Sequence, residues 1–189
     1  MNAEVAIVAI AALVLIGLFL VKTYDRLVTL KQRVNEAWSD IEVQLTRRHE
    51  LVAELVGTVR GHVGHERDTL EGVTRARQQA VEVRGLGPSQ RAQPENVLGD
   101  ALRRLFALAE QYPQLRAVES FTRLRTELSA VEENIAFAKR FYNGNVRDHN
   151  TALLAFPTNL IAGMFGSRQE RYFEIADDVE RGAPQVRFT

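Results

Sequence analysis

The chain has 189 residues, of which 46% are hydrophobic and 25% are charged, which is enough for one folded domain and an anchor. Its 24 basic and 24 acidic residues balance, and no run of Arg or Lys is interleaved with aromatic residues, so we predict that it does not bind nucleic acid. The absence of cysteine excludes a disulfide framework, a thiolate nucleophile and a thiolate metal site.

The first element is an uncharged apolar run from Val5 to Val21. As a helix it would be about 26 Å long, at the short end of what crosses a membrane, so it predicts a single transmembrane helix. A cleaved signal peptide is one alternative, but no basic residue precedes the run and no small-residue cleavage site separates it from Lys22 and Tyr24. A buried core helix is the other, and it would show a polar face, which the run lacks.

Basic residues lie on one side of this run only. None precedes it, whereas Lys22, Arg26, Lys31 and Arg33 follow it. The positive-inside rule therefore predicts that the residues after the span face the cytoplasm. Lys22, Tyr24 and Arg26 are candidate membrane-proximal residues, with Tyr24 as an aromatic anchor at the interface. The basic flank either contacts anionic lipid or is simply solvated, because acidic neighbours dilute its charge.

A long stretch from Leu27 to about Ala80 contains no proline and repeats an apolar residue every three or four positions, which predicts a continuous helical rod of roughly 80 Å. One apolar stripe needs a partner that buries it, so the rest of the chain is expected to pack against this rod. The stripe consists of Leu30, Val34, Ala37, Ile41, Leu45, Val52, Leu55, Val59, Val63, Leu70 and Val73.

The stripe turns polar at Arg48 and Glu66. Charged groups on a buried face need partners, and the second long helical pattern offers Glu127, Glu132 and Glu133. We predict ion pairs that set the register between the helices rather than a catalytic centre.

Three glycines, Gly57, Gly61 and Gly64, fall on the side of the rod opposite Val59 and Val63. Each costs about 1 kcal/mol relative to alanine inside a helix. A face without side chains lets another backbone approach closely, so the glycines are candidate interaction residues for another helix or a second copy of the chain. The alternative is a flexible or kinked segment.

Residues 83–94 contain two glycines and two prolines, which predicts a loop, and a short helix is expected from Glu95 to Gln111 before a turn at Tyr112-Pro113. This short helix spans only about 25 Å, so a return of the chain beside the rod requires the loop to climb back along it. We prefer this arrangement to a break in the first rod.

The second long pattern runs from Leu115 to Phe156 and is expected to pack along the first. Phe137 and Phe141 lie on its opposite side and are further candidate interaction residues. Both long helices therefore have two apolar sides, which predicts at least three helices in the bundle or self-association.

The segment from Leu153 to Phe165 is apolar but too interrupted to span a membrane. If the second long helix returns antiparallel to the first, this segment arrives at the membrane face, so Leu160 and Phe165 are candidate membrane-proximal residues. Residues 167–189 are polar and are expected to form a loosely held tail.

No pattern of catalytic or metal-binding residues emerges. His49-Glu50 and His65-Glu66 are not followed by the second histidine that an HExxH zinc motif requires. The Gly85-Leu86-Gly87 sequence follows no strand, and no GxSxG element occurs. We predict no enzyme activity, no cofactor and no metal.

Three strings, AWSDIEVQL, FALAEQYPQL and FPTNLIA, carry a resemblance. Within the sequence from Tyr24 to Gly166 they resemble the bacterial LemA family. The chain differs at Asp25, where the family often has Asn, at Ala53-Glu54, where a Pro-Asn pair is replaced, and at Ser167, where an aromatic residue is common. Without the proline, the helix should be straight near Ala53. The resemblance implies a membrane-anchored, all-helical cytoplasmic domain with no catalytic residues to carry over.

These features predict an all-α protein, an elongated antiparallel helical bundle of three to four helices, two of them very long, behind an N-terminal transmembrane helix. The predicted parts are an extracytoplasmic N-terminus (residues 1–4), the transmembrane helix (5–21), a LemA-like bundle (22–166) and a polar tail (167–189). We expect it in the bacterial inner membrane, with the C-terminal domain in the cytoplasm.

Two functions fit this architecture. The first is a non-enzymatic scaffold or adaptor linked to envelope processes, whose partners are other membrane or cytoplasmic proteins and further copies of the chain. The second is a lipid-facing structural protein that shapes or organises membrane. In both cases the span contacts membrane lipid, and nucleic acid is not a partner.

Overall fold

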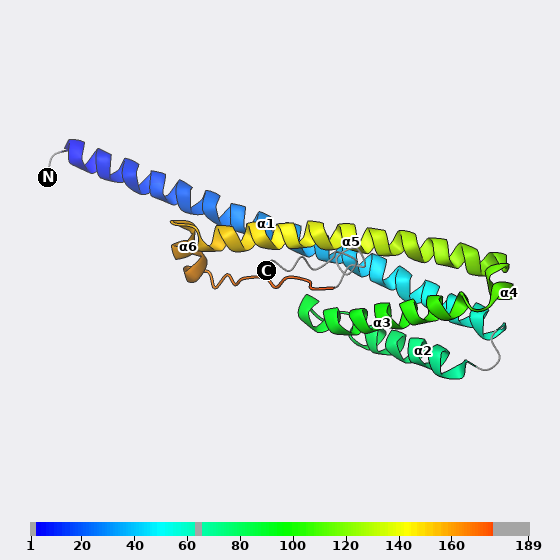
Figure 1. Cartoon of the computed structure of the whole chain (residues 1–189). Helices are drawn as coiled ribbons and strands as arrows, with labels where there is room; N and C mark the ends of the chain where they lie inside the picture. Colours follow the sequence, from blue (N-terminus) through cyan, green and yellow to red (C-terminus); the bar gives the residue numbers. More distant parts are fainter. Residues whose placement is uncertain (1–2, 63–65, 176–189) are drawn as a thin grey trace, which may run out of the picture. The chain divides into compact units, whose positions relative to one another are not determined.

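The computed structural model describes residues 3–62 and 66–175, and all regular structure within these ranges is helical (Figure 1). The predicted all-α helical bundle is therefore confirmed, and the two very long helices are α1, of 58 residues, and α5, of 36 residues. The helices are α1 (Ala3–Arg60), α2 (Arg67–Glu82), α3 (Pro88–Ala109), α4 (Pro113–Arg116), α5 (Glu119–Leu154) and α6 (Thr158–Met164).

The described chain forms two compact units, and both long helices contribute to each of them. The first unit contains α1 as far as Trp38, α5 from Phe141, α6, and the chain up to Arg171. The second unit contains the remainder of α1, α2 to α4, the first part of α5, and residues 172–175 at the end of the described chain.

The predicted apolar stripe is the buried side of α1. Seven of its residues are at most 2% exposed, and α1 passes Ala53 without interruption, as the absence of proline there led us to expect. The stripe also continues onto α2, where Leu70 and Val73 are buried. The seven residues are Val34, Ala37, Ile41, Leu45, Val52, Leu55 and Val59.

The prediction of one continuous rod to Ala80 is wrong, because α1 ends at Arg60 and α2 begins at Arg67. The chain leaves the helix in a tight turn at Gly61, where the His62 N–H donates to the Val59 carbonyl at 2.9 Å. Glycine is among the poorest helix formers, so a helix ends more easily here than in the preceding sequence. The break lets α2 fold back along α1, which removes the need for a climbing loop.

The prediction of a loop over residues 83–94 is also wrong in its extent. The connection closes within residues 83–87, with Gly85 in a left-handed conformation at φ 79°, and α3 begins at Pro88. Proline suits a first helical position, and the Gln90 side chain accepts from the Gly87 N–H at 3.2 Å. Pro94 lies in the second turn of α3; it deprives the Gln90 carbonyl of a partner, but Gln90 is exposed and water can replace it.

In the second unit, polar contacts fix the helix directions. Arg77 of α2 donates to the His49 carbonyl (2.6 Å), and Arg84, just after the end of α2, donates to Thr46 (3.0 Å), so α2 runs antiparallel to α1. Helix α3 pairs with α2 as a helical hairpin and therefore runs parallel to α1. The core that these helices enclose with α5 includes Leu55, Leu98, Leu105, Leu115 and Phe121.

In the first unit, α5 runs antiparallel to α1. The Trp38 and Tyr142 rings lie 5.4 Å apart, and farther toward the N-terminus of α1, Leu27 packs with Ala152 and Leu153 at the end of α5. Ala162 of α6 joins the same cluster, and it holds α6 beside the first half of α1.

The expectation of a loosely held tail is wrong for residues 167–175. Phe173 is fully buried and Ile175 is 5% exposed, and both belong to the second unit. The Lys139 ammonium donates to the Ile175 carbonyl at 3.0 Å, and the Asn96 side chain donates to the Glu174 carbonyl at 3.4 Å. The segment is mostly polar, so its two buried apolar residues, Phe173 and Ile175, were overlooked. They are two positions apart, which is the spacing of an extended chain with one buried face.

Candidate functional site

The apolar segment of α1 is exposed throughout its described length. From Ile7 to Val21 the large apolar side chains are 40–68% exposed, and no part of the most hydrophobic window is buried. The segment is therefore not a core helix of the described structure, and its length and composition allow it to cross a membrane.

The first unit also exposes six large apolar side chains, which we call the collar: Tyr24, Leu154, Phe156, Leu160, Met164 and Phe165. The Tyr24 and Phe165 rings lie 4.8 Å apart, so the structure brings these two predicted residues together. Leu160 lies on the exposed side of α6, whereas Ile161 and Ala162 face inward. Lys22 and Arg26 are exposed on α1 within one turn of Tyr24.

The chain after α6 is fixed to the first unit by Glu170. Its carboxylate pairs with Lys31, its N–H donates to the Asn150 side chain at 2.8 Å, and its carbonyl accepts from the same side chain at 2.9 Å. The Tyr142 hydroxyl donates to the Arg171 carbonyl at 2.8 Å. Burial, assisted by the Glu170 charge, raises the pKa of Tyr142 to about 12.

The second unit contains a buried ionic network centred on Glu95 of α3, which is 0% exposed. Its carboxylate pairs with Arg48 and lies 3.1 Å from Nε2 of His49, and Arg48 also donates to Glu132 of α5 at 3.0 Å. Arg91, likewise fully buried, donates to Glu42 at 2.8 Å. The network thus ties α1, α3 and α5 together, and the predicted pairing of Arg48 with Glu132 is confirmed.

The charges of this network stabilise one another. Burial opposes ionisation of Glu95, but the hydrogen bond from His49 and the charge of Arg48 lower the pKa of Glu95 overall. Burial likewise opposes the charge of Arg48, yet Glu132 and Glu95 raise the pKa of Arg48 overall. Both groups therefore stay ionised in the folded protein. Of the other predicted partners, Glu127 pairs with Arg47 at 2.9 Å instead, and Glu133 is exposed.

Sequence reasoning missed Glu95 and Arg91 because both fall in the stretch expected to be a loop or the beginning of a helix. Both are charged residues inside a helix, and this could have drawn attention to them. The sequence shows it only if α3 is known to begin at Pro88.

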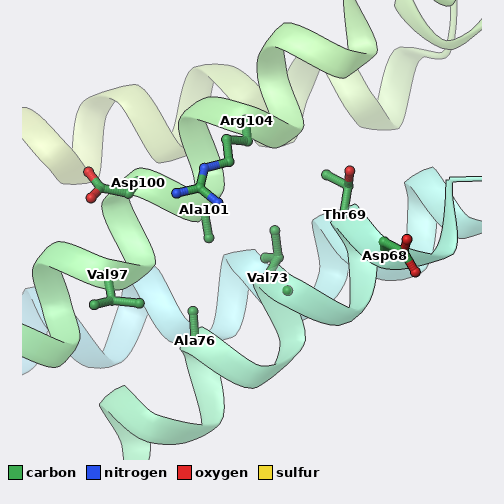
Figure 2. A pocket seen from close by; sticks show the side chains of 9 residues that line it. Asp68, Thr69, Val73, Ala76, Val97, Asp100, Ala101 and Arg104 are labelled. Carbon is green, nitrogen blue, oxygen red and sulfur yellow. The ribbon is translucent and has the colours of Figure 1, made fainter.

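A shallow groove of about 410 Å³ runs between α2 and α3 in the second unit (Figure 2). Val73 and Ala76 of α2 and Ala101 of α3 point into it. The side chain of Val97, also on its wall, is 41% exposed, and the charged groups along the edges are Asp68, Asp100 and Arg104. Small side chains at the base of an open groove suit the side chains of another helix.

The other predicted interaction residues belong to the parts of the chain that form α1 and α5 and to the turn after α1. Gly57 is exposed on α1, and a Cβ built there would meet no atom within 4 Å; one built at Gly61 would meet only the Thr58 carbonyl, at an ordinary 3.7 Å. Gly64 lies outside the described residues. Phe137 and Phe141 are 66% and 56% exposed on α5. Among the described atoms, no second backbone approaches Gly57 or Gly61.

Within residues 3–62 and 66–175, no group of three His, Asp or Glu side chains is arranged to hold a metal ion. Nor do the histidines form a catalytic arrangement there: His49 is buried in the ionic network, His149 is buried in the first unit, and Nδ1 of His62 donates to the Thr58 carbonyl.

The sequence profile of the LemA family matches residues 37–188. The chain belongs to the LemA family. The profile extends past Gly166 and so includes the buried Phe173 segment that the resemblance alone did not cover.

Three relatives are similar to this LemA protein over most of its length. It is 26% identical to "Magnetosome protein MamQ 1" of Paramagnetospirillum magneticum, over 82% of this chain and 66% of the relative, just under two thirds. It is 26% identical to "Magnetosome protein MamQ" of Magnetospirillum gryphiswaldense, over 95% of this chain and 75% of that one. It is 27% identical to "Protein LemA" of Metamycoplasma hominis, over 80% and 68%.

Proposed function

We propose that this LemA protein is a non-enzymatic, single-pass protein of the bacterial inner membrane whose cytoplasmic helical bundle is a scaffold or adaptor. The observation that carries the proposal is the continuity of α1, an unbroken helix from Ala3 to Arg60. Its first part is apolar and exposed, and its last part is built into the core of the second unit. The membrane segment and part of the bundle thus belong to the same helix.

The groove between α2 and α3 supports the scaffold role. It presents an apolar base between charged edges, the arrangement in which an amphipathic helix of a partner or of a second copy can lay its apolar side. The names of the magnetosome relatives assign those proteins to a cellular assembly rather than to a reaction, which favours a structural role here as well.

Site-directed photo-crosslinking in cells tests the scaffold role. A photoreactive amino acid replaces Val97 in the groove of the full-length chain, and in a matched control it replaces Glu133, which is exposed on α5 and does not line the groove. We expect discrete crosslinked products from position 97, either of twice the mass of the chain or with one other protein, and only background from position 133. Equal background from both positions would contradict the proposal.

A second function, a lipid-facing protein that organises membrane, is favoured by the collar. Leu160 and Phe165 are about 60% exposed although apolar, and Phe165 contacts Tyr24 just after the apolar segment. Burying such side chains in lipid removes apolar surface from water, which is worth about 25 cal/mol per Å².

Liposome co-sedimentation distinguishes the two functions. A chain lacking residues 1–21, if it remains folded by circular dichroism, is mixed with liposomes, and the double variant Leu160→Asp/Phe165→Asp is compared with Val43→Asp, an exposed apolar position of the second unit. Binding that is lost only in the double variant favours the lipid-facing role. Absence of binding in the parent chain would rule out the collar as a lipid-contacting surface.

A further inference from the structure

The first unit contains a second open pocket, of about 450 Å³, beside the collar. Tyr24, Val28 and Phe165 form an apolar part of its wall, and Lys31 and Arg168 supply positive charge. All five residues belong to the same unit, so the pocket is built from α1 and the chain that follows α6. Neither proposed function accounts for a pocket that combines these two kinds of lining.

If α1 crosses the membrane, the end of the pocket at Tyr24 lies at headgroup height. Along a helix, Tyr24 is roughly 5 Å and Lys31 roughly 15 Å beyond Val21, where the uncharged run ends, and the headgroup layer extends about 5–8 Å from the hydrocarbon core. The run itself is only about 26 Å long against a core of about 30 Å, so the mismatch draws the residues after Val21 toward the lipid.

The charge of the pocket favours an anion. Lys31 pairs with Glu170, whose backbone is itself fixed by Asn150, so these two charges offset one another. Arg168 also lines the pocket, and in the described part of the chain no ion pair or hydrogen bond engages it. Its guanidinium therefore leaves a net positive charge, with the planar geometry that binds phosphate oxygens in pairs.

We propose that this pocket binds an anionic phospholipid, with the headgroup phosphate against Arg168 and Lys31 and the first acyl carbons along Tyr24, Val28 and Phe165. The inference rests on the membrane anchor of the proposed function. It goes beyond that function because it assigns a stoichiometric lipid site and a headgroup class, where an anchor alone contacts any lipid.

Native mass spectrometry of the full-length chain in neutral detergent tests the site, with phosphatidylglycerol and phosphatidylcholine offered separately. We expect one retained phosphatidylglycerol and little phosphatidylcholine. Arg168→Gln should weaken phosphatidylglycerol binding about five-fold, as expected for one arginine near a lipid surface. The matched control is Arg171→Gln, an exposed arginine of the same segment that does not line the pocket, and it should bind as the parent does. Equal retention of both lipids, or equal loss in both variants, would overturn the proposal.

Two further arms separate lipid from free phosphate and from the anchor. Inorganic phosphate should not displace the lipid, and Phe165→Ser should weaken lipid binding; displacement by phosphate with no effect of Phe165→Ser would show a simple anion site and overturn the lipid assignment. Carbonate extraction of cell membranes reports on the anchor independently. If the chain stays in the membrane pellet but fails the lipid test, only the proposed lipid site is contradicted. If carbonate releases the chain, the membrane anchor of the proposed function is contradicted.

Discussion

Replacing Glu95 by glutamine tests the buried ionic network most sharply. Glutamine keeps the shape of the side chain but removes the charge that compensates Arg48, and its amide group places new donors against His49. Arg48 keeps Glu132 as its remaining carboxylate partner. Removing one partner of a buried ion pair costs about 3–5 kcal/mol, so we expect Glu95→Gln to lower the free energy of unfolding by roughly 3 kcal/mol.

The assay is urea unfolding of the full-length chain in neutral detergent, followed by far-ultraviolet circular dichroism. Arg47→Gln is the matched control, because Arg47 is the neighbour of Arg48 on α1 and pairs with Glu127 of α5, but its side chain is half exposed. An exposed pair contributes about 0–1 kcal/mol. If both variants lower the free energy of unfolding by an equal and small amount, the network does not tie the three helices together.

A double variant, Arg48→Met/Glu95→Met, separates loss of charge balance from loss of contact. Because both charges disappear together, no uncompensated charge stays buried, and apolar replacement of a buried pair is often neutral. We therefore expect the double variant to be more stable than Glu95→Gln. The single variants Arg48→Met and Glu95→Met complete the comparison. If the double variant loses as much free energy of unfolding as these two single variants together, Arg48 and Glu95 do not interact.

Three further predictions concern pH and helix propensity. The pKa of Glu95 is lowered from its ordinary 4.5, so its stabilisation is complete above pH 4.5 and is lost as the pH falls through the folded-state value; unfolding at neutral and acid pH should show a smaller acid loss in Glu95→Gln than in the parent. The pKa of Tyr142 is raised from 10.0 to about 12, so its stabilisation is present below pH 10 and is lost between pH 10 and about 12; a tyrosinate absorbance titration should lose its highest step in Tyr142→Phe. Gly57→Ala should raise the free energy of unfolding by up to about 1 kcal/mol, because the added methyl meets no atom of the described structure, and a loss in the urea assay would contradict this.

The helices were predictable wherever one periodic pattern was complete. The buried stripe of α1 follows from spacing alone. A charge on a buried helix side needs a partner on the facing helix, so a carboxylate partner for Arg48 was also predictable, although the sequence offered Glu132 as only one of three candidates. The meeting of Tyr24 with Phe165 followed from the antiparallel return of α5.

The errors arose where local signals compete with tertiary packing. The apolar period continues from α1 into α2, so periodicity alone joined them across the break at Gly61. Pro94 suggested a helix start, but tertiary contacts of Arg91 and Glu95 hold α3 helical on both sides of it. The burial of Phe173 depends on a surface formed by distant helices, which no local pattern encodes.

The topology of α1 tests the central claim most directly, and the absence of native cysteine makes the measurement clean. Single-cysteine variants Glu4→Cys and Glu133→Cys are treated in intact spheroplasts with a membrane-impermeant maleimide, before and after lysis. The account predicts labelling of position 4 in intact spheroplasts and of position 133 only after lysis. Labelling of position 133 in intact spheroplasts, or of neither position until lysis, would contradict a span whose helical bundle faces the cytoplasm.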